Sequence, residues 1–412
     1  MNSAPASRRI FLADADAFYV AVARMVDPEG AGKAPLLIVG GSRESRGVVC
    51  SASYETRKFG VRSAMPISRA LRLCPDALCV PVPRKACSEK SHEIREVLGR
   101  FAPVVEGASI DEWYLDLAGT EGMYHNEALS VTAHRIRDAV RRETSLSVSI
   151  GGGTNKLVAK LAVERAKPKP GSGADGVHIV PAGSEAEFLK TFSLAEIPLI
   201  GPKFQERLAS FGMVNVPDVL PYDIAALQAW FGKREAEWLW DRVRGINDSE
   251  VDPGGDQKSM SRDETFPQDI DDDRELGREL VALVTRAAFD LRSDGLAART
   301  ITVKIRDRDF RTRSARRTLA QPVVSDRVLL KVARELLAKL RAARRIPARL
   351  LGVAVSSLSE DPDADQLALF AARSDPDAET LRDRILARAV DRVRAKYGAK
   401  SVMPGRLTPK DE

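Results

Sequence analysis

The chain has 412 residues, of which 44% are hydrophobic and 30% are charged. At roughly 100–200 residues per domain, this length predicts two to four domains with full-sized cores. The composition predicts a folded, soluble protein, neither disordered nor built into a membrane. Because no stretch approaches ~18 uninterrupted apolar residues, we expect no transmembrane helix.

The N-terminus and the cysteines favour a cytoplasmic protein. The first nine residues, MNSAPASRR, lack the apolar core of a secretory signal and run directly into a strand-like segment. The four cysteines show no CxxC pair and no histidine at zinc spacing. They are Cys50, Cys74, Cys79 and Cys87. We expect all four to be reduced, buried thiols.

The net charge of +6 is unevenly distributed. Between Arg286 and Arg349 there are 18 Lys and Arg residues against 6 Asp and Glu, a local net charge of +12, so the rest of the chain sums to −6. A basic module on an otherwise acidic protein favours a polyanionic partner, most simply nucleic acid. A solvated helical face carries such charge as well, so this feature leaves both interpretations open.

The hydrophobic pattern of the first 165 residues predicts a mixed sheet with helices. Strands are expected at 10–13, 35–39, near 48, twice within 104–117, and at 146–150, with helices at 18–25, 67–74, 129–143 and 154–165. The resulting order β-α-β-β-α-β, with a large insertion after the first strand, fits a ferredoxin-like split βαβ sheet.

Breaks in composition divide the rest of the chain. The Pro- and Gly-rich segment 167–176 precedes a helical region that extends to about residue 244, and an acidic linker at 247–257 follows. The basic module after it predicts a helix at 273–292, strands at 299–306 and 311–319, a helix at 326–343 and a strand at 349–355. A second linker at 359–365 leads to a charged helix at about 377–396. The chain therefore predicts an α+β multidomain protein.

Three carboxylates form the first candidate site. Asp14 ends the first predicted strand, and Asp111 and Glu112 lie near a hairpin junction in the same predicted sheet. Because neighbouring strands lie ~4.8 Å apart, acids at adjacent strand ends can share a cation. Hard oxygen ligands suit Mg²⁺, and two such ions promote phosphoryl transfer. Strand-end acids that face water have the same spacing, so both interpretations stay open.

Two basic segments are candidate phosphate contacts. In SASYETRKFG, hydroxyl groups and cations stand close enough to clamp a triphosphate, although a surface helix start looks similar. Its candidate residues are Ser51, Tyr54, Arg57 and Lys58. In TNKLVAKLAVERAKPKP, Lys156 and Lys160 follow helical spacing and Lys167 stands at the end of the helix. An amphipathic helix explains that pattern too, and the question is whether Lys167 reaches phosphate.

Two further segments indicate binding partners. In LIGPKFQERLASFGM (199–213), an Ile-Gly-Pro turn between helices resembles a helix-hairpin-helix element, whose backbone N–H groups hold a DNA phosphate without reading sequence. An ordinary turn between helices is the alternative. In QLALF (366–370), apolar residues stand between two acidic linkers. Such residues are costly unless a partner's pocket buries them, or unless they pack against the tail helix.

The motifs DADAFYVAV, SASYETRKFGVRSAMP, SIDEWYLDL, TNKLVAKLA and LIGPKF together resemble those of Y-family DNA polymerases, in the same order. The chain is similar to the DinB, or DNA polymerase IV, branch over about Arg9 to Leu358. The resemblance implies a ferredoxin-like palm, a fingers insertion, an all-α helix-hairpin-helix thumb and an α+β little finger that grips duplex DNA. We expect the palm at 1–26 and 76–170, fingers at 27–75, thumb at 171–245, linker at 246–258, little finger at 259–358 and tail at 359–412.

The resemblance also implies residue roles. Asp14, Asp111 and Glu112 match the catalytic, metal-binding acids of two Mg²⁺ sites, where Mn²⁺ can substitute, and the backbone carbonyl of Ala15 completes the second site. Tyr19 matches the steric gate that rejects ribonucleotides. The triphosphate contacts match Ser51, Tyr54, Arg57 and Lys167, and DNA contacts are expected at Gly201, Lys203, Arg306, Arg308, Arg311 and Arg313. The residues Gln366, Leu367, Leu369 and Phe370 resemble a sliding-clamp-binding peptide, which raises time on the primer end by effective concentration.

The implied activity is template-directed, low-fidelity DNA synthesis of the translesion class. The primer 3′-hydroxyl attacks the α-phosphate of a dNTP, and pyrophosphate leaves. Small residues over the base pair would admit damaged templates; they are Ala52, Ser53 and Ala64. The sequence contains no second cluster of acids like that of an exonuclease, so we expect no proofreading. We expect primer–template DNA, dNTP and the sliding clamp as partners, and no association with a membrane. The protein is expected to be a monomer in the bacterial cytoplasm, associated with the nucleoid.

Departures from the family pattern leave alternatives. Ala17 and Tyr19 replace the Cys and Phe common in bacterial DinB proteins, and Trp113 replaces a small residue, so it either reshapes the floor of the site or packs into the sheet. A non-catalytic accessory protein that binds DNA and the clamp is one rival function. The retained acids, together with Tyr54 and Arg57, argue against it. A transferase that adds a single base would need side chains that template the nucleotide, and we identify none.

Overall fold

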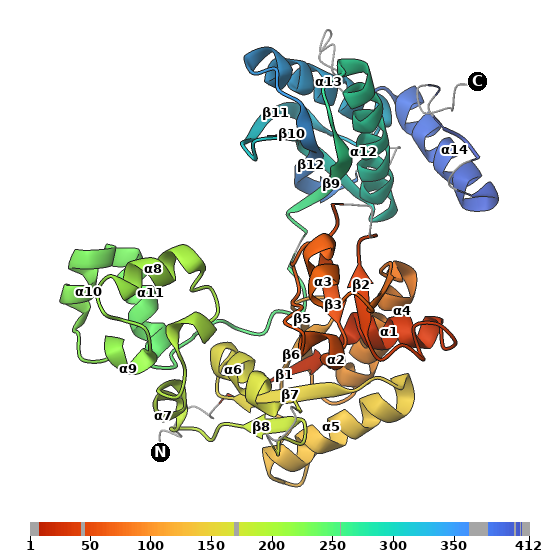
Figure 1. The fold of residues 1–412 in the computed structure, drawn as a ribbon. Helices are drawn as coiled ribbons and strands as arrows, with labels where there is room; N and C mark the ends of the chain where they lie inside the picture. The colour runs from red at the N-terminus through yellow and green to blue at the C-terminus, as the bar shows by residue number, and fades with distance from the viewer. Residues whose placement is uncertain are drawn as a thin grey trace. The chain divides into compact units, whose positions relative to one another are not determined.

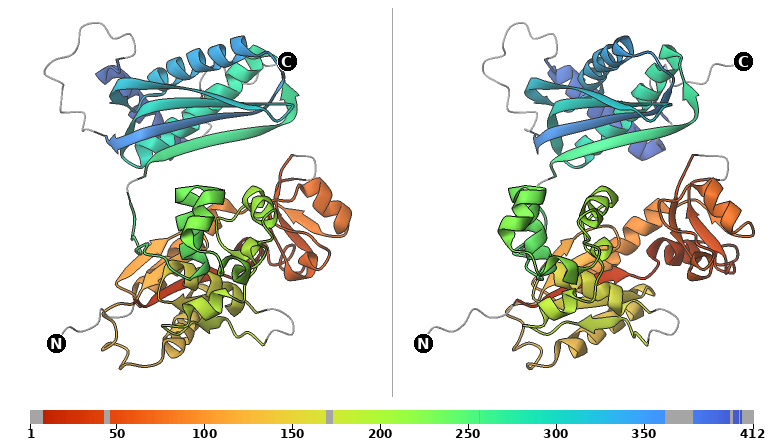
Figure 2. Two further views of the ribbon diagram at one scale, coloured as in Figure 1. Left: turned by 90° about the vertical axis from the view of Figure 1, so that its left-hand side faces the viewer. Right: turned by 60° about the vertical axis from the view of Figure 1, so that its left-hand side comes forward.

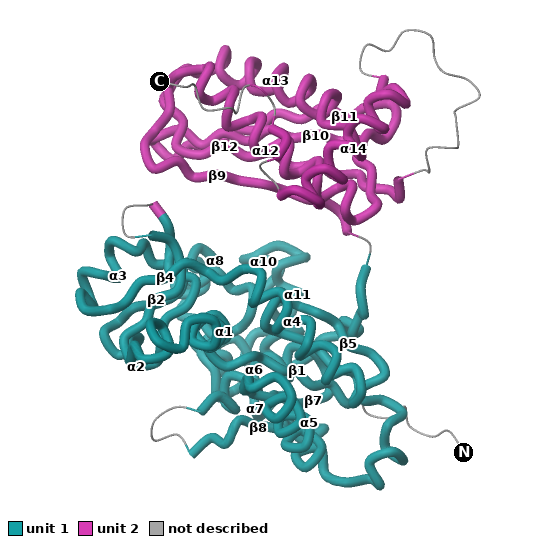
Figure 3. The backbone as a smooth tube through the Cα atoms, turned by 90° about the vertical axis from the view of Figure 1, so that its right-hand side faces the viewer, with its two compact units in different colours: residues 1–43, 47–255 teal, residues 44–46, 256–412 magenta. Residues whose placement is uncertain are grey.

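The computed structural model describes residues 8–42, 46–168, 173–255, 257–361, 378–398, 401–403 and 405. Its chain forms two compact units, residues 1–43 with 47–255, and residues 44–46 with 256–412 (Figure 3). Within these described ranges, no helix has the length and apolar character needed to cross a membrane.

A five-stranded sheet is the centre of the first unit, in the order β5-β6-β1-β7-β8 (Figure 1). Its strands are β1 (Ile10–Ala15), β5 (Val104–Gly107), β6 (Glu112–Asp116), β7 (Val148–Gly153) and β8 (Val177–Ile179). β1 pairs antiparallel with both β6 and β7, whereas β7 and β8 are parallel. The first four strands have the order of a ferredoxin-like fold, which confirms the predicted fold class.

Helices cover both faces of this sheet because its strands alternate between them. Phe11 and Ile150 point to a core shared with α1 (Phe18–Val26), α4 (Arg84–Gly99) and α5 (Leu129–Thr144). Ile10 and Leu12 point to the opposite face, where they pack against α6 (Lys156–Ala166).

A run of three glycines in β7 lets α6 lie directly on the sheet. A Cβ atom on Gly151 would stand 2.1 Å from the backbone nitrogen of Val163 and 2.4 Å from the carbonyl oxygen of Ala159. A Cβ atom on Gly153 would stand 2.5 Å from Val158 Cγ1. Backbone atoms of a helix cannot move aside as a flexible side chain can, so α6 keeps this position only above glycine.

The fingers form a separate small sheet in the order β3-β2-β4. It contains β2 (Leu37–Gly40), β3 (Val49–Ala52) and β4 (Leu78–Val80), with the short helices α2 (Tyr54–Arg57) and α3 (Ile67–Leu73). The predicted boundaries put β4 in the palm, but it pairs with β2 of the fingers sheet. They put β8 in the thumb, but it pairs with β7 of the palm sheet. Both have three residues, too few for a period of two to reveal a strand.

The segment after β8 is helical, as expected for the thumb. It contains α7 (Glu185–Leu189), the 3₁₀ turn η1 (Leu194–Glu196), α8 (Pro202–Ala209), α9 (Val216–Val219), α10 (Ile224–Phe231) and α11 (Lys233–Val243). Leu208, Leu227 and Leu239 are fully buried in its core.

The predicted linker is attached to the palm over part of its length. Val251 packs with Ile10 and Leu12 of β1. The Glu106 carboxylate accepts the N–H of Asp252 at 2.7 Å and the Lys156 ammonium at 2.6 and 2.7 Å. The first residues of this linker therefore belong structurally to the first unit.

The second unit is a four-stranded antiparallel sheet in the order β11-β10-β12-β9. Its elements are β9 (Ser259–Ile270), α12 (Asp273–Ser293), β10 (Leu296–Asp307), β11 (Thr312–Val323), α13 (Asp326–Ala343) and β12 (Ala348–Glu360). Both helices pack on one face, against Ile301, Val303 and Val353 (Figure 2). Sequence patterns missed β9 because it is an edge strand that contains Pro267 and has few buried residues.

A last helix, α14 (Leu381–Tyr397), attaches to this unit through ion pairs. Arg292, with 4% of its side chain exposed, binds Asp391 at 2.6 Å, and Arg327 binds Asp383 at 2.7 Å. The predicted clamp-binding peptide 366–370 lies outside the described residues.

Candidate active site

A cavity of about 220 Å³ opens where β1, β3, α2 and the β5–β6 hairpin meet. It is lined by all of the residues predicted for metal and nucleotide binding: Asp14, Ala15, Tyr19, Ser51, Tyr54, Arg57, Asp111, Glu112 and Lys167. Asp16, Ala17, Phe18, Cys50 and Ser63 complete the lining. Segments more than 150 residues apart in the chain thus meet at one cavity.

Strand register brings the three acids together. Asp14 lies directly opposite Glu112 in the β1–β6 ladder, and the N–H of Ala15 donates to the carbonyl of Asp111 at 2.9 Å. The preceding pair, Ala13 and Trp113, points to the other face because side chains alternate along a strand. Trp113 is 1% exposed in the palm core, so it packs into the sheet and does not form the floor of the site.

Two lysines hold two of these carboxylates. Asp14 is 7% exposed, and this burial raises its pKa to about 7 although the nearby ammonium of Lys167 opposes the shift. Lys167 Nζ lies 3.0 Å from Asp14 Oδ2 and 2.5 Å from Glu164 Oε1. Burial lowers the pKa of Lys167, but its two carboxylate partners outweigh burial and leave that pKa raised. Lys160 binds Glu112 in the same way.

The remaining acids of the cavity bind hydroxyl groups. The hydroxyl of Ser109 donates to Asp111 Oδ1 at 2.5 Å, and Ser149 donates to Asp16 Oδ1 at 2.7 Å. Asp111 therefore has no lysine partner within the described part of the chain. Its carboxylate is bound to Ser109 at the hairpin, and the residue lines the cavity.

The donor set fits a hard divalent cation in its chemistry. It consists of three carboxylates and the backbone carbonyl of Ala15, the oxygen ligands that such ions prefer. Among the described residues, no three Asp, Glu, His or Cys side chains converge closely enough to hold a metal by themselves. Instead, the ammonium groups of Lys160 and Lys167 supply positive charge to the acids, as a bound cation would.

The opposite wall of the cavity carries a group of cationic and hydroxyl side chains. Arg57 Nη2 lies 3.5 Å from Ser51 Oγ, and its guanidinium carbon lies 5.0 Å from the centre of the Tyr54 ring. Arg57 Nε also donates to the carbonyl of Ala52 at 2.9 Å, which fixes the guanidinium. This group presents donors to an anion in the cavity.

Ala52 and Ser53 do not line the cavity, contrary to expectation. Each is 1% exposed within the fingers. The Ser53 hydroxyl caps α2 by accepting the N–H of Thr56 and donates to the carbonyl of Pro35, so it has no capacity left for a base pair. Ala64, by contrast, is exposed.

Tyr19 stands in the first turn of α1, beside the acids. Its ring meets Phe18 edge to face at 5.6 Å, and burial raises the pKa of its hydroxyl, which therefore stays protonated at neutral pH. Ala17 begins the helix in a left-handed conformation, with φ 48°.

Two of the four cysteines differ from the predicted buried thiols. All four are free, and Cys74 and Cys87 are buried as expected, but Cys79 is half-buried and Cys50 is exposed and lines the cavity. In β3, Cys50 stands between the buried residues Val49 and Ser51. The alternation of a strand is the signal that would have found it.

The predicted DNA-contact residues fall into two groups. Gly201 and Lys203 are exposed at the start of α8, and Arg308 and Arg311 are exposed at the β10–β11 hairpin. Arg306 lies on the sheet face opposite the helices, as do Lys304 and Arg316, by strand alternation. Arg313 lies on the covered face instead, where it binds Asp307 at 3.0 Å and the carbonyl of Leu340. It is thus engaged inside the unit.

Comparison with known proteins agrees with this fold. Residues 13–164 match the impB/mucB/samB family and residues 257–369 match the C-terminal domain of that family. A DNA polymerase IV from Dehalococcoides mccartyi (strain CBDB1) is 36% identical over 97% of both chains, and one from Halorhodospira halophila is 36% identical over 89% of this chain and 99% of its own.

Solved structures show the same likeness. A Y-family DNA polymerase chimera of Dbh and Dpo4 covers 85% of this chain and 98% of its own, at 25% identity and a TM-score of 0.73. An insertion ternary complex of Dbh DNA polymerase covers 84% and 98%, at 26% identity and a TM-score of 0.58.

The fold and these likenesses define a DNA-directed DNA polymerase of the Y family. The chain belongs to the impB/mucB/samB family and, within it, to the DinB-type polymerases. Its activity is low-fidelity translesion DNA synthesis, and polymerases of this family use divalent metal ions. The accessory-protein alternative finds no support among these relatives.

Proposed function

We propose that Asp14, Asp111 and Glu112, with the backbone carbonyl of Ala15, hold two Mg²⁺ ions, or Mn²⁺ in their place, during nucleotidyl transfer. When bound, such ions supply charge that favours attack by the primer 3′-hydroxyl and departure of pyrophosphate. The observation that supports this proposal most is the cavity of about 220 Å³, because acids, cations and Tyr19 from distant segments all line it.

The chain's own residues bind and orient the dNTP. Ser51, Tyr54 and Arg57 present donors to the triphosphate from the fingers side of the cavity. Tyr19, from the palm side, packs under the sugar and rejects a 2′-hydroxyl by contact. Holding the reactants in this way supplies much of the rate enhancement in phosphoryl transfer.

Lys167 exchanges partners during this cycle. In the free protein its ammonium lies 3.0 Å from Asp14. Lysine is a point charge on a flexible stem, so it can leave a carboxylate for a phosphate without losing a fixed geometry. We infer that Lys167 holds Asp14 until substrate arrives and then binds the triphosphate.

The thumb and the little finger bind DNA. Primer–template DNA contacts Gly201 and Lys203 in the thumb and Arg306, Arg308 and Arg311 in the little finger, by backbone-directed contacts that do not read sequence. Arg313 supports the little finger from within. We retain the domain boundaries proposed from the sequence, except that β4 joins the fingers and β8 joins the palm.

We further propose that the peptide 366–370 docks on the replicative sliding clamp. The protein would then act as a monomer at the bacterial nucleoid, in keeping with the bacterial relatives. Docking on the clamp would raise the residence time at the primer end through effective concentration.

Primer extension tests the proposed site directly. Wild type, Asp111→Ala and the surface control Asp138→Ala would be compared on an undamaged template with Mg²⁺ and single dNTPs. We expect template-directed addition by wild type and the control, and none by Asp111→Ala. Tight DNA binding without extension by any of the three would contradict the proposal and favour a non-catalytic role.

A further inference from the structure

An exposed aromatic residue stands at the tip of the β10–β11 hairpin. Phe310 is 64% exposed, and its backbone has φ 66°, a left-handed conformation that bulky residues rarely adopt. Among the described residues, one other large apolar side chain is more than half exposed and has a left-handed backbone. It is Leu199, in the helix-hairpin-helix turn. A strained and solvent-exposed ring is costly in both respects, and such strain points to function.

One arginine contacts this ring and two more stand beside it in the hairpin, and the described structure gives none of the three a carboxylate partner. Arg308 and Arg311 flank Phe310 on the hairpin and are exposed, and Arg349 places its guanidinium carbon 4.6 Å from the ring centre. Because Arg349 covers one face of the ring, the other face is left for a ligand. Arg349 thus places positive charge on the ring, and Arg308 and Arg311 add two exposed cations to the same hairpin.

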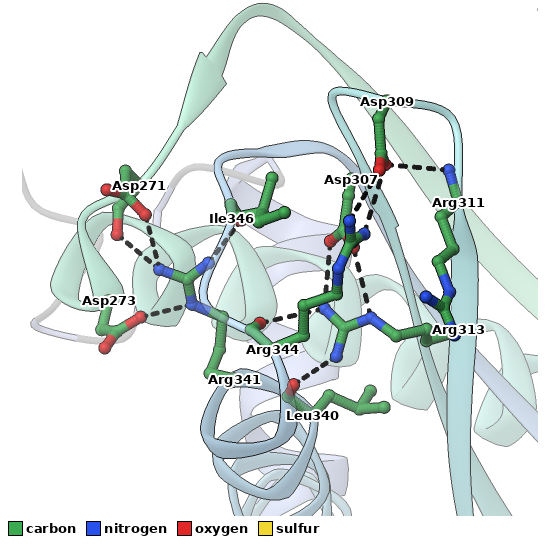
Figure 4. A network of polar contacts seen from close by, with 10 residues as sticks. All are labelled: Asp271, Asp273, Asp307, Asp309, Arg311, Arg313, Leu340, Arg341, Arg344 and Ile346. Atoms are coloured by element: carbon green, nitrogen blue, oxygen red, sulfur yellow. Dashed lines mark hydrogen bonds and ion pairs between the residues drawn. The ribbon is translucent and has the colours of Figure 1, made fainter.

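Neighbouring arginines, in contrast, bind aspartates. Asp307 is fully buried and binds Arg313 at 3.0 Å and Arg344 at 2.5 Å, and Arg344 also binds Asp309 at 2.7 Å (Figure 4). The carboxylate of Asp309 accepts the N–H of Arg311 as well, at 3.2 Å. These contacts join the hairpin to the end of α13, so the residues on each side of Phe310 are fixed.

The hairpin backbone is fixed by further bonds. The N–H of Arg308 donates to the carbonyl of Pro347 at 3.0 Å, and the N–H of Phe310 donates to the carbonyl of Asp307 at 2.9 Å. The ring is therefore presented by a rigid frame, which reduces the entropy lost on binding.

We propose that Phe310 is a stacking platform for an unpaired base of single-stranded nucleic acid. Its open ring face receives the base, while Arg308, Arg311 and Arg349 hold the adjoining phosphates. Aromatic stacking beside cations is the means by which proteins bind single strands without sequence preference. This site differs from the sheet face with Lys304, Arg306 and Arg316, which carries charge but no aromatic residue. The inference rests on the DNA-binding role proposed for this unit.

The chemistry of the tip favours nucleic acid over a protein partner. The exposed apolar surface is a single ring, too small for a protein interface core. The carboxylate of Asp309, which precedes the ring in the chain, is paired with Arg344. The charge left on Arg308, Arg311 and Arg349 is therefore positive, as a strand of phosphates requires. A protein contact is nevertheless a distinct outcome of the test below.

Binding of the full chain to labelled oligonucleotides tests this inference. We would measure fluorescence anisotropy with a 20-nucleotide single strand and with a 20-base-pair duplex, for wild type, Phe310→Ala and Phe310→Trp. Stacking of one base predicts that Phe310→Ala weakens single-strand binding about tenfold and leaves duplex binding within about twofold. Phe310→Trp should bind the single strand as wild type does, because it keeps an aromatic ring. Phe289→Ala, which removes a 40%-exposed phenylalanine of the same unit, is the matched control and should bind as wild type.

Two further readouts separate stacking from charge. A single strand that contains 2-aminopurine should lose fluorescence on binding wild type and lose less on binding Phe310→Ala. The dependence of affinity on salt should be unchanged in Phe310→Ala, whereas Arg308→Ala with Arg311→Ala should lower the slope by about 1.4, at about 0.7 for each phosphate contact.

Each contrary result has its own meaning. If Phe310→Ala binds single strands as wild type does, the stacking platform is overturned, and the exposed ring is assigned to a protein contact. If wild type binds neither single strands nor duplex, the DNA-binding role of the whole unit fails and this inference fails with it.

Discussion

Two buried aspartates, one in each unit, show how the same side chain serves opposite purposes. Asp14 in the palm is 7% exposed and binds Lys167 through one oxygen. Asp307 in the little finger is fully buried and binds Arg313 and Arg344 through both oxygens. Burial raises the pKa of Asp14 to about 7, so its partner leaves the carboxylate incompletely stabilised.

The identity of the cation explains the difference. Arginine provides a planar fork that matches a carboxylate and keeps its geometry, whereas lysine provides one mobile charge. Lysine suits a carboxylate that must accept a new partner during a reaction. Arginine suits a carboxylate that holds a hairpin in place. The two sites can therefore be distinguished by substitutions that remove or exchange these partners.

The largest effect is expected from Asp14→Asn. This change keeps the size of the side chain but removes the charge that we propose binds a metal ion, so nucleotide incorporation should fall about a thousandfold or more. Single-turnover primer extension measures the loss, and DNA binding by anisotropy should stay within about twofold. Incorporation above a tenth of the wild-type rate would remove Asp14 from the metal site.

Asp307→Asn should affect stability and leave the palm chemistry intact. Two guanidinium groups would lose a buried charged partner, which costs about 3 kcal/mol. Urea denaturation followed by far-UV circular dichroism would detect an earlier transition of the second unit. Arg345→Ala, at an exposed ion pair with Asp273, is the control and should shift the transition little. An unchanged transition in Asp307→Asn would show that the arginines find other partners.

Exchanging the cation at the palm site tests whether a lysine is needed beside Asp14. In Lys167→Arg, a fork would hold Asp14 more rigidly, so the Mg²⁺ concentration for half-maximal extension should rise about fivefold. Lys167→Met should not raise it, because the competing charge is gone, although its KM for dNTP should increase. Equal Mg²⁺ requirements in wild type and Lys167→Arg would contradict the idea that lysine yields to the ion.

The smallest effect concerns the attachment of α14 at low pH. The hydrogen bond from Arg327 lowers the pKa of Asp383 from 3.8 to about 2. A lowered pKa in the folded state stabilises the fold above pH 3.8, and this contribution is lost as the pH falls through 2. A fluorescent label on α14 should therefore report that the helix loosens as wild type is titrated from pH 3.8 to about pH 2. In Asp383→Asn that acid-dependent step should be smaller, since the pair between Arg292 and Asp391 is retained.

Much of the palm site could be predicted from the sequence because its residues stand in contiguous motifs. The acids, Tyr19 and the group around Arg57 all line one cavity, as expected. The direction of a side chain was harder to predict, since it depends on strand register. Register decided that Trp113 enters the core and that Arg313 faces α13, although neighbouring residues in each strand face the other way.

Short and edge elements limited the prediction of the fold. β4 and β8 have three residues each, and their membership follows from pairing partners that no local pattern reveals. β9 escaped because an edge strand tolerates proline and exposed polar residues. Capping likewise assigned Ser53 to α2, since a helix start and a binding loop share residue types.

The glycine run of β7 has a genetic consequence. Gly151, Gly152 and Gly153 carry no chemistry, yet each excludes a side chain from contact with α6, Phe11 or Ile179. Since α6 carries Lys160 and ends beside Lys167, a displaced helix would withdraw both cations from the acids. Missense alleles at the codons of Gly151 and Gly153, the two glycines under α6, should therefore behave in a mutagenesis screen as catalytic lesions do, and a suppressor would arise in the helix rather than in the cavity.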